Sequence, residues 1–323
     1  MNKISTGVWA YGACSDRYVG SGYKTRLPLL QRIERLGGIK GVEGIEITYP
    51  GDFDEHSYAE YAPLLQKHGL GISSMGVEIV CDKEWQTGSF TSPDPIVRQK
   101  AVSLTQSAMD FAASIGVEVV SLWMGQDGHD YFLQADYARQ WDWLVEGLRL
   151  CANHNPGVKL GIEYKASEPR LSCMVKSGGV ALALAQCCGC QNVGVTMDVG
   201  HALNSRENIA ETAAILLRQN RLFHLHLNDN YIMADDDMPI GSVHFMHFLE
   251  LFFWLKRLNY KGWYCLDMYP YRDDPNEAVR ASIRFIRGME HFVNEKLADY
   301  NFEAKTAEAP GKILTELFGK IFG

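Results

Sequence analysis

Short apolar runs alternate with longer stretches of helical periodicity along most of the chain. A continuous apolar run is typical of a strand in a parallel sheet, because both faces of such a strand are buried. Strands that alternate with helices predict repeated βα units. The strands are expected at Ile4–Trp9, Gly44–Thr48, Ile72–Ile79, Val117–Trp123, Val158–Glu163, Val193–Asp198, Leu222–Asn228 and Gly262–Met268.

Between these strands, apolar residues recur at the spacing of an amphipathic helix. Clear cases are Pro95–Ile115, Tyr137–His154, Gly178–Cys188 and Ser242–Leu258. Eight strand–helix units close into a (β/α)8 barrel, the TIM barrel, which commonly occupies one domain of this length. We therefore predict an α/β fold of the TIM barrel type, with an open, doubly wound sheet as the alternative.

The chain continues beyond the predicted barrel. A helix at Asn276–Lys296 is expected to close the barrel, so that residues 1–296 form the catalytic domain and residues 297–323 a C-terminal helical extension. From Ile313 to Phe322 the extension carries apolar residues at helical spacing, and these need an apolar surface to bury against. That surface belongs either to the chain's own barrel or to a second subunit, which predicts a homodimer or homotetramer.

Composition excludes several classes of partner. The net charge is −8, with 39 acidic and 31 basic residues, and no cluster of Lys and Arg indicates a nucleic-acid surface. No apolar run is long enough for a membrane-spanning helix or a signal peptide. The eight cysteines are irregularly spaced. They favour free thiols in a reducing cytoplasm over a zinc or redox site, so a cytoplasmic location is expected.

Each of four consecutive predicted strands carries a carboxylate or an imidazole at or near its C-terminal end. These residues are Glu163, Asp198, His226 and Asp267. In a TIM barrel the C-terminal ends of the strands meet at one rim, where catalytic groups lie. Several carboxylates there would repel one another unless a divalent cation lay between them. Mixed carboxylate and imidazole ligation suits Mn²⁺ or Mg²⁺, with Co²⁺ as a further candidate.

Other polar residues near this rim extend the candidate site. Asp235 and Asp237 lie in the loop after strand seven, and His201 follows Asp198 by three residues, so these three residues could bind a second metal. Lys165 follows Glu163 by two residues and could polarise a substrate oxygen, or else pair with Glu168 at the surface. His224 lies two residues before His226, so both point the same way. We expect His224 to line the barrel more deeply and to bond its neighbours.

Several segments together resemble xylose isomerases. Glu163–Arg170 reads Glu-Tyr-Lys-Ala-Ser-Glu-Pro-Arg and is similar to their Glu-Pro-Lys-Pro-Asn-Glu-Pro-Arg segment. Gly88–Arg98 and Val119–Gly125 resemble a Gly-Gly-Phe-Thr-Ser-Asn-Asp-x-x-Val-Arg stretch and a Val-x-Trp-Gly-Gly strand end. The Asp-x-Asp-x-x-x-Gly spacing from Asp235 to Gly241 matches their second-metal loop. The resemblance runs in order from about Trp9 to Asp267.

The resemblance implies roles for the candidate residues. It assigns one metal to Glu163, Asp198, His226 and Asp267, and a second, catalytic metal to His201, Asp235 and Asp237. It also implies that Lys165 contacts the carbonyl-end oxygen and that Trp123 walls the pocket. The implied reaction is aldose–ketose isomerisation by a metal-assisted hydride shift between neighbouring carbons.

Aromatic and polar residues at the rim are candidates for sugar binding. Trp9 and Trp123 are expected to close strands one and four, where their rings could stack on sugar C–H faces. The loop after strand four carries Gln126, Asp127 and His129, which we expect to contact substrate hydroxyls.

The sequence also departs from xylose isomerases. It has His226 where they have an acidic residue and Asp198 where they have Glu, a set that resembles rhamnose isomerases. Their ring-opening His-Asp pair has no match in Ile47–His56. These departures favour a small unphosphorylated sugar: a tetrose, a pentose such as apiose, or a deoxyhexose.

The main alternative is a ketose 3-epimerase that uses Glu163 and Asp267 as its acid/base pair. Asp235 and Asp237 would have no purpose in a one-metal epimerase, which favours the isomerase. A proton-transfer route through an enediol, with Glu163 as base, is the alternative to the hydride shift. A phosphodiesterase would need more strand-end histidines and a basic surface. A purely sugar-binding protein would have no need of this ligand set.

Overall fold

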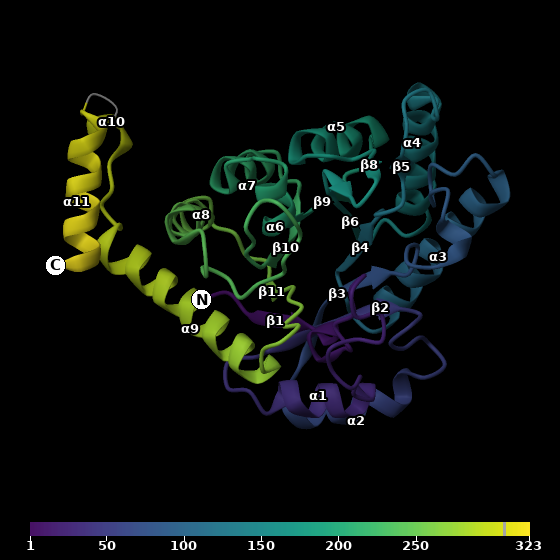
Figure 1. The fold of residues 1–323 in the computed structure, drawn as a ribbon, viewed down its shortest axis with the longest axis horizontal. Coiled ribbons are helices and arrows are strands. Elements are labelled where there is room, and N and C mark those ends of the chain that lie inside the picture. The colour runs from purple at the N-terminus through teal and green to yellow at the C-terminus, as the bar shows by residue number, and fades with distance from the viewer. Residues whose placement is uncertain (306–307) are drawn as a thin grey trace.

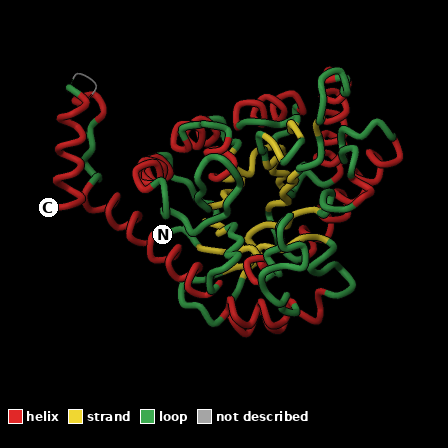
Figure 2. Tube along the Cα trace, viewed as in Figure 1, coloured by secondary structure: helices red, strands yellow, loops and turns green. Residues whose placement is uncertain are grey.

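The predicted strands form a closed parallel barrel in a computed structural model that describes residues 1–305 and 308–323. The order around the barrel is β1-β11-β10-β9-β6-β4-β3-β2, which confirms the TIM barrel prediction (Figure 2). The strands are β1 (Ile4–Gly7), β2 (Gly44–Tyr49), β3 (Gly71–Val77), β4 (Val119–Trp123), β6 (Lys159–Glu163), β9 (Val193–Asp198), β10 (Leu222–Leu227) and β11 (Tyr264–Leu266).

Several strands are shorter than predicted, and the changes in β1 and β11 affect residues of the rim. Trp9 lies in a short 3₁₀ helix, η1 (Val8–Tyr11), and not at the end of a strand. Its ring folds back over Gly7, where a Cβ atom would lie 2.1 Å from the indole, so a side chain at position 7 would displace the ring. Asp267 lies just beyond the end of β11.

Helices surround the barrel (Figure 1). Several begin at a side-chain cap: Asp94, Asp136, Ser177, Asn208 and Asp274 each accept a hydrogen bond from a backbone N–H of the first turn. The helices around the barrel are α1 (Leu29–Gly37), α2 (Tyr58–His68), α3 (Pro95–Ser114), α4 (Tyr137–His154), α5 (Gly178–Cys188), α6 (Val199–Asn204), α7 (Ile209–Arg218), α8 (Phe245–Arg257) and α9 (Pro275–Lys296).

A small antiparallel sheet is built from the loops that follow β4 and β6. It consists of β5 (Gly128–His129), β7 (Ser167–Glu168) and β8 (Leu171–Cys173), in the order β5-β8-β7. A short 3₁₀ helix, η2 (Lys83–Trp85), lies in the loop after β3. Because it joins the two loops, the small sheet holds the Lys165 segment beside the Gln126 segment at the rim.

Part of the barrel interior is polar. Ser5, Ser74, Ser121 and Thr196 are buried there together with Glu46. The hydroxyl oxygens of Ser74 and Ser121 are 3.1 Å apart, and those of Ser121 and Thr196 are 2.6 Å apart. The apolar core therefore lies mainly between the strands and the surrounding helices.

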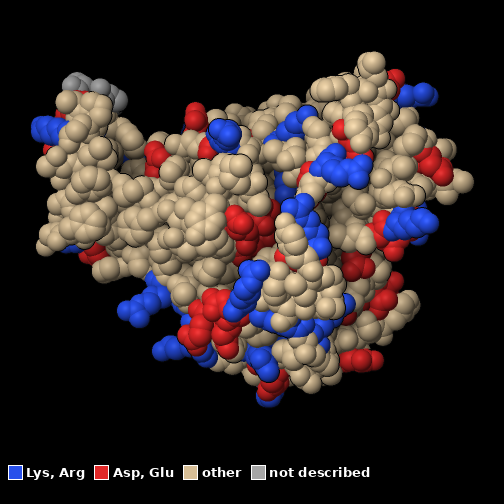
Figure 3. All heavy atoms as spheres, viewed as in Figure 1, with Lys and Arg blue, Asp and Glu red and all other residues tan. Residues whose placement is uncertain are grey.

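The C-terminal extension is helical, as predicted. It contains α10 (Phe302–Lys305) and α11 (Pro310–Phe322), which we call the arm. Figure 1 shows both helices standing away from the barrel beyond the end of α9. Lys and Arg are interspersed with Asp and Glu on the visible face, while other residues dominate the surface near the arm (Figure 3). No described helix is long and apolar enough to cross a membrane.

Candidate metal centre

Glu163, Asp198, His226 and Asp267 converge as predicted. One ligand atom of each lies within 4.8 Å of every other. His226 Nδ1 is 3.5 Å from Glu163 Oε1, 3.8 Å from Asp198 Oδ2 and 3.4 Å from Asp267 Oδ2. The first three residues are buried and Asp267 is partly exposed. We call these four residues the strand-end group.

Strand register brings this group together. Glu163 and Asp198 are the last residues of β6 and β9. His226 of β10 pairs in register with Asp198 on one side and with Cys265, two residues before Asp267, on the other. Asp198 also begins α6, because its Oδ1 accepts the backbone N–H of His201 at 2.8 Å. The backbone thus fixes each side chain at the same rim.

The strand-end group fits a divalent cation. The buried Nδ1 of His226 has no hydrogen-bond partner among the described residues, although three carboxylates face it. Burial, together with the charges of Asp198 and Glu163, raises the pKa of Asp267 to about 7 despite the opposing effect of His226. Crowded carboxylates around an unpartnered imidazole nitrogen are the donor set that Mn²⁺, Mg²⁺ or Co²⁺ accepts.

His201, Asp235 and Asp237 lie beside this group, and we call them the loop group. His201 Nε2 is 3.1 Å from Asp235 Oδ2, and its Nδ1 is 3.5 Å from Glu163 Oε1. Asp237 accepts a hydrogen bond at 3.2 Å from the side chain of Asn228, which also donates to Asp198 at 2.9 Å. Among the described residues, the loop group does not form a compact ligand cluster like the strand-end group.

The acidic loop is held at its two ends. Asp229 and Met238 exchange backbone hydrogen bonds of 3.0 and 2.9 Å. The Asp229 carboxylate accepts the backbone N–H groups of Val243 and His244 and also contacts His244 Nδ1 at 2.7 Å. Asp235 Oδ1 is buried without a hydrogen-bond partner among the described residues. The loop therefore presents a free carboxylate oxygen to the site.

Lys165 is buried at the rim and is not a surface residue. Its Nζ lies 2.9 Å from Asp235 Oδ2, contacts Glu168, and is 5.2 Å from the ring centroid of Trp123. Burial lowers the pKa of Lys165, but Asp235 and Glu168 raise it by more, so the pKa is above its ordinary value. The ammonium therefore contacts Glu168 and the loop group, and its contact with a substrate oxygen stays a prediction.

The two tryptophans border different parts of the site, Trp9 beside Asp267 and Trp123 beside Lys165. Trp9 Nε1 donates a 2.6 Å hydrogen bond to Asp267 Oδ1. The Trp123 ring packs over Gly125, where a Cβ atom would lie 2.7 Å from the ring. Both side chains are half-buried. Two aromatic surfaces therefore border the carboxylates and the ammonium.

The predicted contact residues after β4 have unequal environments. Asp127 is 1% exposed and accepts four hydrogen bonds of 2.6 to 2.9 Å from the backbone and hydroxyl groups of Ser89 and Thr91. The expected substrate contact by Asp127 is therefore replaced by a structural one. Gln126 accepts the backbone N–H of Cys81 at 3.0 Å. His129 packs against Tyr137, with a centroid distance of 4.9 Å, and has an unpartnered buried Nδ1 among the described residues.

Glu46 is a site residue that sequence reasoning missed. It lies in β2, is 1% exposed, and contacts His224 Nε2 at 2.8 Å and His226 Nε2 at 3.1 Å. The sequence did contain a signal for Glu46, because it is the single carboxylate inside the apolar run from Gly44 to Thr48. The expectation that His224 lines the barrel and bonds a neighbour is confirmed.

Comparison with known proteins indicates the family to which the chain belongs. The xylose isomerase-like TIM barrel family matches residues 30–289. The chain is 25% identical over 298 residues to the xylose isomerase of Thermus thermophilus, covering 88% of this chain and 76% of that protein. An L-ribulose 3-epimerase structure has a TM-score of 0.69 at 15% identity, covering 96% and 99% of the chains. A Methylomonas sp. D-allulose 3-epimerase with D-allulose has a TM-score of 0.68 at 17% identity, covering 89% and 97%.

Fold and site thus define a protein of the sugar isomerase and epimerase class of enzymes. The chain belongs to the xylose isomerase-like TIM barrel family.

Proposed function

We propose that this protein is a metal-dependent aldose–ketose isomerase acting on a small unphosphorylated sugar by a 1,2-hydride shift. The observation that carries the proposal is the strand-end group, with a buried ammonium and a loop group of further ligands beside it. An isomerase needs fixed anchors for two neighbouring sugar oxygens and a positive charge where the carbonyl oxygen gains electron density.

The strand-end group would hold the first metal and the loop group the second. When bound, such cations supply Lewis-acid polarisation and fixed attachment points for substrate oxygens. Mn²⁺ and Mg²⁺ are the preferred ions, with Co²⁺ as a further candidate, because all the ligands are carboxylates or imidazoles. Lys165 would donate hydrogen bonds to the carbonyl-end oxygen of the sugar. Trp9 and Trp123 would exclude water and pack on C–H faces of the open chain.

A ketose 3-epimerase is the second candidate. The observation that favours it is Asp267, which lies near the same nitrogen of His226 as Glu163 and has a pKa of about 7, suited to proton exchange. The loop group and Lys165 have no evident purpose in that reaction. We therefore place the isomerase first.

A substrate screen with Mn²⁺ tests the proposal. Free tetroses, pentoses including apiose, and deoxyhexoses would be incubated with the protein, with phosphorylated sugars as controls. We expect aldose–ketose interconversion without uptake of solvent deuterium at the migrating position. Epimerisation at C3 would favour the second candidate. Full turnover by Glu163→Gln, or after exhaustive chelation, would contradict both, and Glu118→Gln at the opposite barrel end serves as the control.

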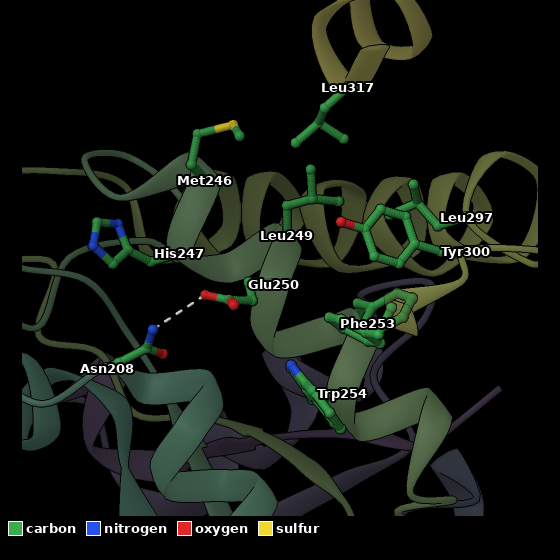
Figure 4. Close-up of a pocket in the computed structure, with 11 residues that line it drawn as sticks. Asn208, Met246, His247, Leu249, Glu250, Phe253, Trp254, Leu297, Tyr300 and Leu317 are labelled. Atoms are coloured by element: carbon green, nitrogen blue, oxygen red, sulfur yellow. Dashed lines mark hydrogen bonds between the residues drawn. The ribbon is translucent and has the colours of Figure 1, made fainter. Parts of the chain in front are cut away.

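We also propose that the protein is cytoplasmic and forms a homodimer or homotetramer through its arm. All eight cysteines are free, which fits a reducing compartment. Leu317 of α11 points into a pocket of about 320 Å³ opposite Leu249 of α8 (Figure 4). Leu314, Phe318 and Phe322 form the outer part of the same apolar helix face, and they are 45%, 43% and 83% exposed. Such a face is typical of a helix that packs on another surface.

A further inference from the structure

The two nitrogens of His226 face different surroundings. Nδ1 faces the three carboxylates of the strand-end group and has no hydrogen-bond partner among the described residues. Nε2 is 3.1 Å from both carboxylate oxygens of Glu46. A carboxylate can only accept here, so Nε2 carries a proton, and in the neutral imidazole that binds a metal the lone pair is on Nδ1. The environment therefore selects one tautomer of His226.

Glu46 reaches His226 across the barrel interior. It comes from β2, which is separated from β10 by β1 and β11 in the barrel. Glu46 and His226 are 1% and 2% exposed, so water does not compete for their hydrogen bond. A buried carboxylate is costly without partners, and His226 and His224 both supply hydrogen bonds to Glu46.

His224 holds Glu46 from the other side. Its Nε2 is 2.8 Å from Glu46 Oε2, and its ring meets the ring of His226 edge-on, with a centroid distance of 5.1 Å and an interplanar angle of 88°. Two imidazoles one layer apart on β10 thus approach one carboxylate from two directions. This leaves the carboxylate little freedom to rotate away from His226.

We propose that Glu46, supported by His224, is a positioning residue that makes His226 Nδ1 a metal ligand. The inference rests on the proposed metal dependence and extends it to residues that do not touch the cation. A carboxylate behind a ligating imidazole fixes its orientation and increases the basicity of the ligating nitrogen. Loss of such a partner lowers metal affinity by about 10–100-fold.

A competing interpretation places a further cation deeper in the barrel, in addition to those at the strand-end and loop groups. One ligand atom from each of Glu46, His224, His226 and Cys265 lies within 4.8 Å of every other. Hydrogen bonds already account for the closest of these contacts, since both imidazoles approach the carboxylate at hydrogen-bond distances. The metal stoichiometry of the variants separates the two interpretations.

The test is calorimetric titration of the metal-free protein with Mn²⁺ at one pH. We expect Glu46→Gln to bind about 10–100-fold more weakly at unchanged stoichiometry. His224→Gln should show a smaller loss of the same kind, and it provides the test if Glu46→Gln does not fold. Ser74→Ala, which alters the same polar interior without contacting His226, should bind within about threefold of the native chain.

Nitrogen-15 NMR of the imidazole groups reports which nitrogen of His226 is protonated. This property would not change if Glu46 only stabilised the fold. In wild-type protein loaded with Mg²⁺, the spectrum should show His226 protonated at Nε2. This signal is assigned by its disappearance in His226→Gln. In Glu46→Gln, His226 should no longer be held in this single tautomer. Native affinity in folded Glu46→Gln, or loss of one bound ion per chain, overturns the inference. Absence of metal binding by the wild-type chain would instead overturn the proposed function and the inference with it.

Discussion

The strand-end group and the loop group differ in what holds them in place. Three strand-end residues lie within strands whose register aligns them, and the fourth follows its strand directly. In the loop group, Asp235 and Asp237 lie in an irregular segment anchored by Asp229. Ligands on rigid elements keep their geometry without a cation, while loop ligands have more freedom to rearrange. The comparison predicts a tight structural metal at the first group and a weaker one at the second.

Removal of a strand-end ligand should have the largest effect. Asp198→Asn keeps the cap of α6 but weakens a central ligand, so we expect metal affinity and turnover to fall by at least about 100-fold, more than for loss of a supporting partner. Titration with Mn²⁺ and steady-state assays measure this. The matched variant Asp235→Asn should keep the first metal. Equal loss of the tight metal in both variants would contradict the assignment of separate metals to the two groups.

Lys165 should affect turnover and leave the first metal in place. Lys165→Met removes the ammonium but keeps an apolar stem against Trp123, so kcat should fall by about 100–1,000-fold, as for loss of one donor that stabilises a developing oxyanion. Affinity for the tight Mn²⁺ should be unchanged. A rise in KM with native kcat would indicate that Lys165 only binds the substrate.

Metal affinity of the strand-end group should depend on pH. The pKa of Asp267 is raised to about 7 in the metal-free protein, so below that pH a proton must leave before the carboxylate can bind a cation. Affinity is expected to rise with pH through about 7, by up to about tenfold per unit for this proton. It should keep rising above pH 7, because burial lowers the pKa of the ligand His226 by less than Glu46 and Glu163 raise it, so this imidazole must also lose a proton. Titrations from pH 5.5 to 8 measure the slope. Asp267→Asn should flatten it, and an unchanged slope in that variant would assign the proton to another group.

The arm should have the smallest effect on the site. Phe318→Glu places a charge on the outer face of α11, so self-association through that face should weaken, while turnover per chain should change by less than about twofold because substitutions far from the site are mostly neutral. Sedimentation velocity measures the association. Lys312→Glu, on the polar side of the same helix, is the control, and unchanged association in Phe318→Glu would exclude this face as the interface.

Much of the rim could be predicted because its signals are local. An apolar run ending in a polar residue marks both a strand and the direction of its C-terminal end, which locates Glu163, Asp198 and His226 at once. The TIM barrel then requires that these ends meet. Lys165 was also found locally, although its burial and its contact with Asp235 depend on how the loop after β10 folds back.

Other features were decided by tertiary structure alone. Glu46 pairs with His226 only because barrel closure lets side chains of β2 and β10 meet in the interior. Asp127 accepts hydrogen bonds from Ser89 and Thr91 because that loop packs over it. Periodicity along the chain reports which residues share an element, since each element repeats a local geometry. Which side chains meet across the interior depends on closure and loop packing, where residues far apart in the chain compete for the same partners.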